Sequence, residues 1–109
     1  MKILIDEQLA VEVNSYMAED EDGESVTLVD GLGVSTILST WESLAPGRRG
    51  FRQGRDDSDT EPATIYVSEA SNNHLEMFDL STFWDGSMEH NAFRLIDLED
   101  TLPIEVVES

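Results

Sequence analysis

Apolar and polar residues alternate along much of the chain, and this alternation is typical of half-buried β-strands. Residues 7–18 fit both a strand and one face of a helix, but the β-branched Val11 and Val13 favour a strand. Pro103 is expected at a strand edge within the last piece. The pattern as a whole predicts strands at residues 2–5, 7–18, 25–29, 63–68, 74–80 and 93–98, and an extended piece at 101–107.

Two turn signals join predicted strands into hairpins. Asp22-Gly23 is a dipeptide that favours positive φ, and it lies in the acidic run 19–24 between two predicted strands. Ser71-Asn72-Asn73 separates the strands at 63–68 and 74–80, and asparagine tolerates the left-handed region. The sequence therefore predicts two hairpins, the first with an acidic tip.

Residues 34–44 are the best candidate for a helix. Apolar side chains recur there at helical spacing, at Ile37, Leu38, Trp41 and Leu44. Residues 30–33 act as a break before this helix, with Ser35 as its N-cap, and Pro46-Gly47 ends it. The alternation of valine, threonine and leucine in the same stretch would also suit a strand.

Residues 46–62 lack any apolar period, and Phe51 is the only large apolar residue among them. Long stretches of this kind inside a small domain are usually functional or disordered. We expect a long mobile loop, which can serve as a linker or become ordered when a partner binds.

Together these elements predict an α+β fold formed by one domain over residues 1–109. We expect a mainly antiparallel sheet of four to six strands, one or two short helices and the long mobile loop at 46–62. The predicted core consists of Ile3, Ile5, Val26, Leu28, Ile37, Leu38, Trp41, Ile65, Val67, Leu75, Met77, Phe83, Trp84, Phe93, Leu95 and Ile96.

Charge adds the strongest functional constraint, because 24 acidic and 6 basic residues give a net charge of −18. Residues 1–45 and 63–109 are both strongly acidic, whereas the arginines and acids of 46–62 cancel. Such a surface repels nucleic acid and anionic membranes, so we expect no direct binding to either.

The chain has no cysteine, which excludes disulfides and thiolate chemistry and fits the cytoplasm. No apolar run is long enough for a membrane span, and the first residues do not form a signal peptide.

No pattern of catalytic or metal-binding residues stands out. His74 and His90 are the only histidines, and neither belongs to a His-Glu-x-x-His motif. Residues 57–61 begin like a calcium loop, but Pro62 and Ser68 occupy the positions that require glycine and glutamate. We therefore predict that the protein is not an enzyme and that it holds no metal and no cofactor.

The acidic runs suit a basic protein partner. Alternate residues of a strand lie about 6.7 Å apart on one face, close to the roughly 6.8 Å of two axial steps along one DNA strand. A row of carboxylates can therefore imitate phosphates, while arginines of the loop supply bidentate contacts and an aromatic ring supplies an anchor. The candidate partner-binding residues are Glu19, Asp20, Glu21, Asp22, Glu24, Asp97, Glu99, Asp100, Arg48, Arg49, Phe51 and Arg52.

These features favour a cytoplasmic inhibitor that binds a basic nucleic-acid-handling protein stoichiometrically, as a monomer or homodimer. In size and charge alone the chain resembles the small acidic phage proteins that mimic DNA and block restriction or CRISPR effectors. An immunity protein that neutralises a nuclease toxin is a close alternative. A domain of unrelated function adapted to high salt is a further alternative, because acids in such proteins serve hydration and solubility.

Overall fold

The computed structural model describes residues 1–54, 64–71, 74–84 and 91–107, with side chains described for 1–51, 65–68 and 92–107. The described chain has an α+β fold, in which every strand pairing is antiparallel. Its elements in chain order are β1 (Lys2–Ile5), β2 (Leu9–Glu12), β3 (Ser15–Glu19), β4 (Ser25–Asp30), α1 (Gly31–Ser43), β5 (Arg49–Gly54), β6 (Thr64–Ser71), β7 (His74–Trp84), β8 (Asn91–Arg94), α2 (Leu95–Thr101) and β9 (Ile104–Val107).

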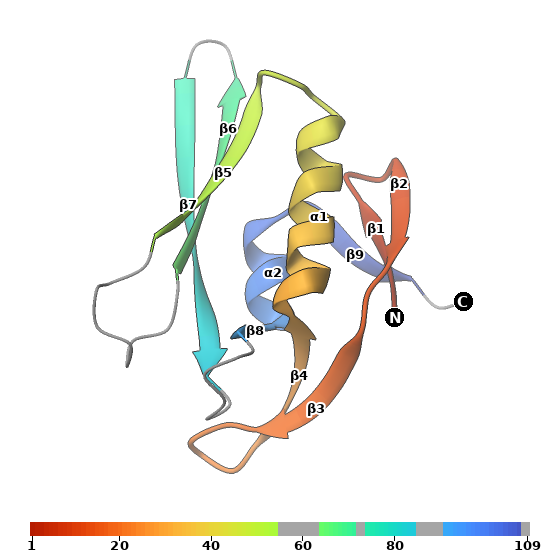
Figure 1. Cartoon of the computed structure of the whole chain (residues 1–109), viewed down its shortest axis with the longest axis vertical. Helices are drawn as coiled ribbons and strands as arrows, with labels where there is room; N and C mark the ends of the chain where they lie inside the picture. The colour runs from red at the N-terminus through yellow and green to blue at the C-terminus, as the bar shows by residue number, and fades with distance from the viewer. Residues whose placement is uncertain (55–63, 72–73, 85–90, 108–109) are drawn as a thin grey trace.

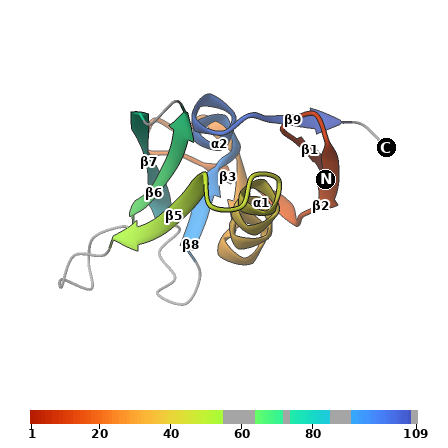
Figure 2. The same cartoon turned by 90° about the horizontal axis from the view of Figure 1, so that it is seen from above.

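The strands form two sheets on either side of α1. A three-stranded sheet has the order β2-β1-β9, and a six-stranded sheet has the order β3-β4-β8-β7-β6-β5. Helix α1 lies between the layer of β5, β6 and β7 and the small sheet (Figures 1 and 2). The chain passes directly from β2 in the small sheet to β3 in the large one, so these two strands connect the sheets.

The core is a cluster of aliphatic side chains around Trp41 of α1. Ile3 and Ile5 of β1 enter it from the small sheet, while Val67 and Phe93 enter it from the large sheet. The core includes these residues together with Val13, Val29, Val34, Ile37, Leu38, Ile65, Leu98 and Leu102. Burial of these apolar side chains is the main force that holds the sheets against the helix.

Helix α1 begins earlier than the sequence predicts. Asp30, not Ser35, is the N-cap, and its side chain accepts a hydrogen bond of 2.7 Å from the Gly33 amide. The first turn packs so closely that a Cβ at Gly33 would lie 2.8 Å from Val29 Cγ1 and 3.1 Å from Val13 Cβ. Residues 30–33 therefore start the helix instead of interrupting the chain.

The predicted strand at 93–98 is wrong beyond Arg94. Strand β8 ends there, and α2 follows at once with Leu98 fully buried. Ile96, predicted in the core, is 61% exposed, because the helical turn places it on the outer face. Val26 is only half-buried. The predicted core residues Leu75, Met77, Phe83 and Trp84 lie outside the described side chains.

Two further segments differ from the prediction. Residues 7–18 form two strands, β2 and β3, with a break at Val13-Asn14 where the chain changes sheets. The interval 46–62, predicted as a loop, contains β5, which pairs with β6 from Arg49 to Gly54. The rest of the predicted loop, residues 55–62, lies outside the described part of the chain. The six-stranded sheet agrees with the predicted sheet of four to six strands, and the three-stranded sheet was not predicted.

Candidate functional site

The β3–β4 hairpin carries the acidic tip that the sequence predicts. Its two strands pair from Ser15–Val29 to Glu19–Ser25, and Gly23 has a φ of 79°, a value that favours glycine. The carboxylate of Asp20 accepts hydrogen bonds of 2.9 Å from the amides of Asp22 and Glu24. Asp20 therefore stabilises the backbone of the turn through hydrogen bonds within it, as short acidic side chains commonly do.

The other acids of the tip point to solvent. Glu19, Glu21, Asp22 and Glu24 are all exposed, whereas Asp20 is half-buried. The expected row of evenly spaced carboxylates does not form, because residues 20–24 make a turn instead of an extended strand. The tip therefore presents a compact cluster of four exposed carboxylates on a hydrogen-bonded turn.

Exposed apolar surface adjoins this cluster on β3. Met17 is 64% exposed and Tyr16 is 37% exposed, two and three residues before Glu19. The Thr27 hydroxyl donates a hydrogen bond of 3.2 Å to the sulfur of Met17 across the hairpin. Methionine adapts its shape to irregular partner surfaces, so this side chain is suited to an interface.

The second predicted acidic set lies on α2. Glu99 and Asp100 are exposed and Asp97 is half-buried. Because these residues are helical, Asp97 and Asp100 share a face, whereas Glu99 lies on a different one. They do not form the strand-like row that the sequence suggested.

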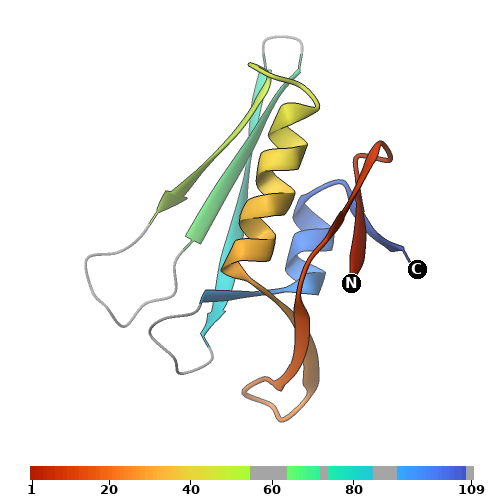
Figure 3. The same ribbon diagram turned by 45° about the vertical axis from the view of Figure 1, so that its right-hand side comes forward.

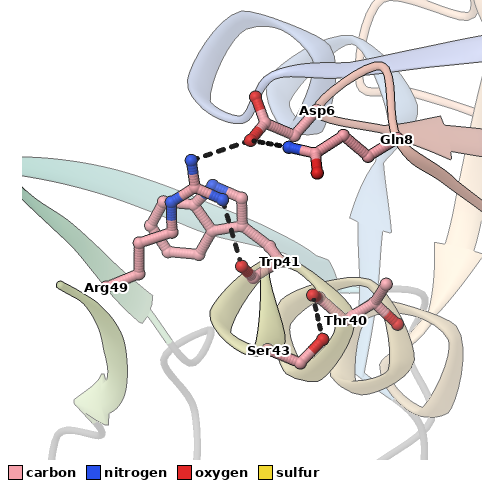
Figure 4. Close-up of polar contacts among 6 residues, drawn as sticks. All are labelled: Asp6, Gln8, Thr40, Trp41, Ser43 and Arg49. Atoms are coloured by element: carbon pink, nitrogen blue, oxygen red, sulfur yellow. Dashed lines mark hydrogen bonds and ion pairs between the residues drawn. The ribbon is translucent and has the colours of Figure 1, made fainter. Parts of the chain in front are cut away.

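Arg49, at the start of β5, is engaged within the fold. Its Nη2 donates to Asp6 Oδ2 at 2.8 Å, and its Nη1 donates to the Trp41 carbonyl at 3.2 Å. The guanidinium carbon lies 5.3 Å from the centre of the Trp41 ring, which makes a cation–π contact (Figure 4). With its side chain only 10% exposed, Arg49 tethers β5 to α1 and to the small sheet.

The carboxylate of Asp6 is held in a strained turn between β1 and β2. Asp6 and Glu7 have φ values of 52° and 56°, in the left-handed region that non-glycine residues rarely adopt. The turn is closed by the Gln8 amide, which donates to the Ile5 carbonyl at 3.0 Å, and the Asp6 amide donates to the Pro103 carbonyl at 2.7 Å. This role of Asp6 was not predictable from the sequence, because nothing in its neighbourhood signals a partner 43 residues away.

The other predicted binding residues of the 46–62 segment are Arg48, Phe51 and Arg52. Arg48 is exposed, and Phe51 is 40% exposed. The side chain of Arg52 lies outside the described part of the structure. Arg48 and Phe51 are therefore accessible to a partner, whereas Arg49 is mainly a structural residue.

The described residues hold no group of three or more histidine, cysteine, aspartate or glutamate side chains that could bind a metal ion. Among the described residues, one open depression lies beside the N-terminus of α1, lined by residues such as Asn14 and Leu32, and another lies beside the Asp6 turn. The buried indole Nε1 of Trp41 has no hydrogen-bond acceptor in the described part of the chain.

No described helix is long and apolar enough to cross a membrane. Neither histidine's side chain is among those described.

Comparisons with protein-family models, with curated proteins and with solved structures found no match.

The hairpin tip is consequently the candidate functional site. It combines four exposed carboxylates, an internally bonded turn and an adjacent exposed methionine. This chemistry suits electrostatic docking to a basic surface.

Proposed function

We propose that this protein is an acidic inhibitor that inserts the β3–β4 hairpin tip into a basic nucleic-acid-binding groove of another protein. The observation that carries the proposal is the construction of the tip. Asp20 uses its carboxylate on the turn's own amides, which leaves Glu19, Glu21, Asp22 and Glu24 facing solvent.

A tip of this kind limits the entropy lost on binding. The backbone of the turn is already held by hydrogen bonds from Asp22 and Glu24 to Asp20 and by the Asp20–Glu24 backbone bond of 2.9 Å. A preorganised element loses less conformational freedom in a complex than a flexible one. The net charge of −18 would also steer the chain toward a basic groove and raise the association rate at low salt.

Met17 supports a specific contact in addition to the electrostatic one. Its side chain is 64% exposed on the strand that leads into the tip, so it would be buried when the tip is inserted. Charge alone attracts many basic proteins, whereas a buried apolar contact next to the charges discriminates among them.

The test is affinity capture from a prokaryotic lysate at low salt, followed by a salt gradient. The proposal predicts retention of one basic nuclease or effector complex, its release at moderate salt, and its displacement by duplex DNA. The captured enzyme should lose activity when one equivalent of this protein is added. Capture of a dedicated nuclease toxin would assign the inhibitor to the immunity class. Retention of only a diffuse set of basic proteins, with no inhibition of any nuclease, would contradict the proposal.

A salt-adapted domain is a second candidate, and the spread of acids favours it. Exposed carboxylates occur on the small sheet at Glu12 and Glu105 and on α2 at Glu99, as well as at the tip. The two candidates predict opposite responses to salt. An inhibitor should be folded in dilute buffer and lose its partner as salt rises, because screening weakens the contact. A salt-adapted domain should unfold in dilute buffer and refold in molar salt, which circular dichroism would detect.

A further inference from the structure

The six-stranded sheet has two free edges of different chemistry. Within the described residues, β3 pairs only with β4, and β5 pairs only with β6. Free edges expose unpaired backbone donors and acceptors, and they invite the addition of another strand. In Figure 3, β5 is the outermost strand of its layer, and in Figure 1, β3 borders the molecule on the opposite side.

The directions of the two edges are compatible with each other. Every successive pair in the order β3-β4-β8-β7-β6-β5 is antiparallel, so β3, β8 and β6 run one way and β4, β7 and β5 run the other. A β3 strand from a second copy would therefore add to β5 in the antiparallel sense. The joined sheet would continue the alternation without a break.

The exposed apolar residues of the two edges lie on the same face of the sheet. Phe51 opposes Val67 of β6, and Met17 lies two residues from Ser15, which opposes Val29 of β4. Val67 and Val29 both belong to the buried core. The pairing of β4 with β8, of β8 with β7 and of β7 with β6 places these two side chains on the same face of the sheet. Phe51 and Met17, 40% and 64% exposed, are therefore positioned to meet when the edges join.

Charge is complementary at the same register. When Phe51 is set opposite Met17 in antiparallel pairing, Arg48 falls beside the Glu19–Glu21 part of the acidic tip. Arg48 is exposed and makes no ion pair with a described residue. By contrast, two β5 edges pairing with each other would bring arginines of both copies together, and like charges opposed across strands are destabilising.

We infer that β5 is a docking edge for β3 of a second copy of this chain, with Phe51 packed on Met17 and Arg48 against the acidic tip. The contact is heterologous, because the two copies use different surfaces. Repetition of such a contact gives rings or open filaments instead of a closed two-fold dimer. It goes beyond the inhibitor role and would cover part of the hairpin that the role requires.

Sedimentation equilibrium of the full chain tests this inference without any other protein, so its failure leaves the inhibitor role untouched. Measurements at about 0.15 M salt screen the repulsion between acidic copies beyond roughly 8 Å, while short contacts persist. The average mass should rise above the 12.2 kDa of one copy and should not level off at two. Met17→Lys and Phe51→Lys should each raise the apparent dissociation constant at least about tenfold.

Mixing these two variants gives the sharpest result. The M17K copy retains an intact β5 edge, and the F51K copy retains an intact β3 edge, so one native contact forms per pair. The mixture should give a one-to-one dimer at concentrations where each variant alone is monomeric. Ile96→Lys is the matched control, because Ile96 is 61% exposed on α2 and belongs to neither edge strand, so this variant should associate like the parent chain. Circular dichroism checks that all variants fold.

Three outcomes would overturn the inference. The first is a parent chain that remains monomeric up to about 1 mM, a concentration at which even weak association would be detected. The second is a dimer that stops at two copies and is unaffected by Met17→Lys, as pairing between two β5 edges would give. The third is the absence of a dimer in the mixture of M17K and F51K.

Discussion

The two strand-connecting turns at residues 6–8 and 20–24 use an aspartate carboxylate in different ways. Asp20 accepts hydrogen bonds from amides two and four residues ahead, entirely within its own turn. Asp6 accepts from Gln8 within its turn, but also from Arg49, 43 residues later in the chain. The Asp20 carboxylate bonds only within its own turn, whereas the Asp6 carboxylate also binds a distant element.

This difference distinguishes the proposed binding element from a structural one. Because the tip at 20–24 satisfies its backbone internally, its remaining acids are available to another molecule. The turn at 6–8 is tied to α1 and β5 through Arg49, so its carboxylate is already occupied. Changes at the Asp6 turn should therefore affect stability, and changes at the exposed acids of the tip should affect binding.

Arg49→Ala is expected to have the largest effect on stability. It leaves the Asp6 carboxylate without its charged partner and removes the contact with Trp41, at a site where the arginine side chain is only 10% exposed. Loss of one member of this part-buried pair should lower the free energy of unfolding by about 2 kcal/mol, less than for a fully buried pair, as measured by urea titration. Arg48→Ala, at an exposed neighbour, should change it by less than about 0.5 kcal/mol.

A double-mutant cycle with Asp6→Ala sharpens this prediction. Asp6 and Arg49 should show a coupling energy of about 1–3 kcal/mol, whereas Asp20 and Arg49 should show none. Equal effects of Arg48→Ala and Arg49→Ala would mean that the ion pair has no structural role.

Asp20→Ala should have an intermediate effect, because its two hydrogen bonds are local and partly solvated. We expect a loss of about 1 kcal/mol in the free energy of unfolding, together with faster amide exchange at Asp22 and Glu24. Asp20→Asn should retain most of the stability, since the amide oxygen still accepts hydrogen bonds. Unchanged exchange at both amides would show that the carboxylate does not fix the tip.

Glycine exchanges should act with opposite sign at the two turns. Gly23→Ala should destabilise the chain by about 1 kcal/mol, because Gly23 has a φ of 79° and alanine avoids that region. Glu7→Gly should stabilise it by up to about 1 kcal/mol, because Glu7 has a φ of 56° and glycine adopts that value without strain. Thermal unfolding measures both, and the same sign for both variants would contradict the assignment of strain.

Neutralising single exposed acids of the tip should have the smallest effect. Glu21→Gln and Glu24→Gln should each change the free energy of unfolding by less than about 0.5 kcal/mol, since both side chains are exposed to solvent. The change should be slightly stabilising, because it reduces repulsion among like charges. A loss above about 1 kcal/mol in a urea titration would mean that the tip is part of the structure and not a free surface.

Sequence patterns predicted the features that depend on neighbouring residues. The hairpin tip follows from Asp22-Gly23, the end of α1 from Pro46-Gly47, and the pairing of β6 with β7 from alternating apolar residues. Features decided by distant contacts were missed. Strand β5 lacks an apolar alternation, and its position depends on pairing with β6 and on the Arg49 tether.

The error at α2 has a similar cause. Residues 93–98 look like a strand, but Leu98 and Leu102 enter the core from helical spacing. Tertiary burial overrides local strand propensity in such short segments. For the candidate site, the acids of the tip were predictable from the sequence. That the Asp20 carboxylate accepts hydrogen bonds within the turn, unlike its exposed neighbours, is known only from the structure.

The most direct measurement compares two charge-neutralised variants by calorimetric titration against the captured basic partner. One variant is Glu19→Gln, Glu21→Gln, Asp22→Asn and Glu24→Gln, with Asp20 retained. The matched control neutralises Glu7, Glu12, Glu99 and Glu105, which are exposed elsewhere. The proposed function predicts at least about a hundredfold loss of affinity for the tip variant and less than about tenfold for the control. Equal losses in both variants would show that net charge, and not the hairpin tip, mediates binding.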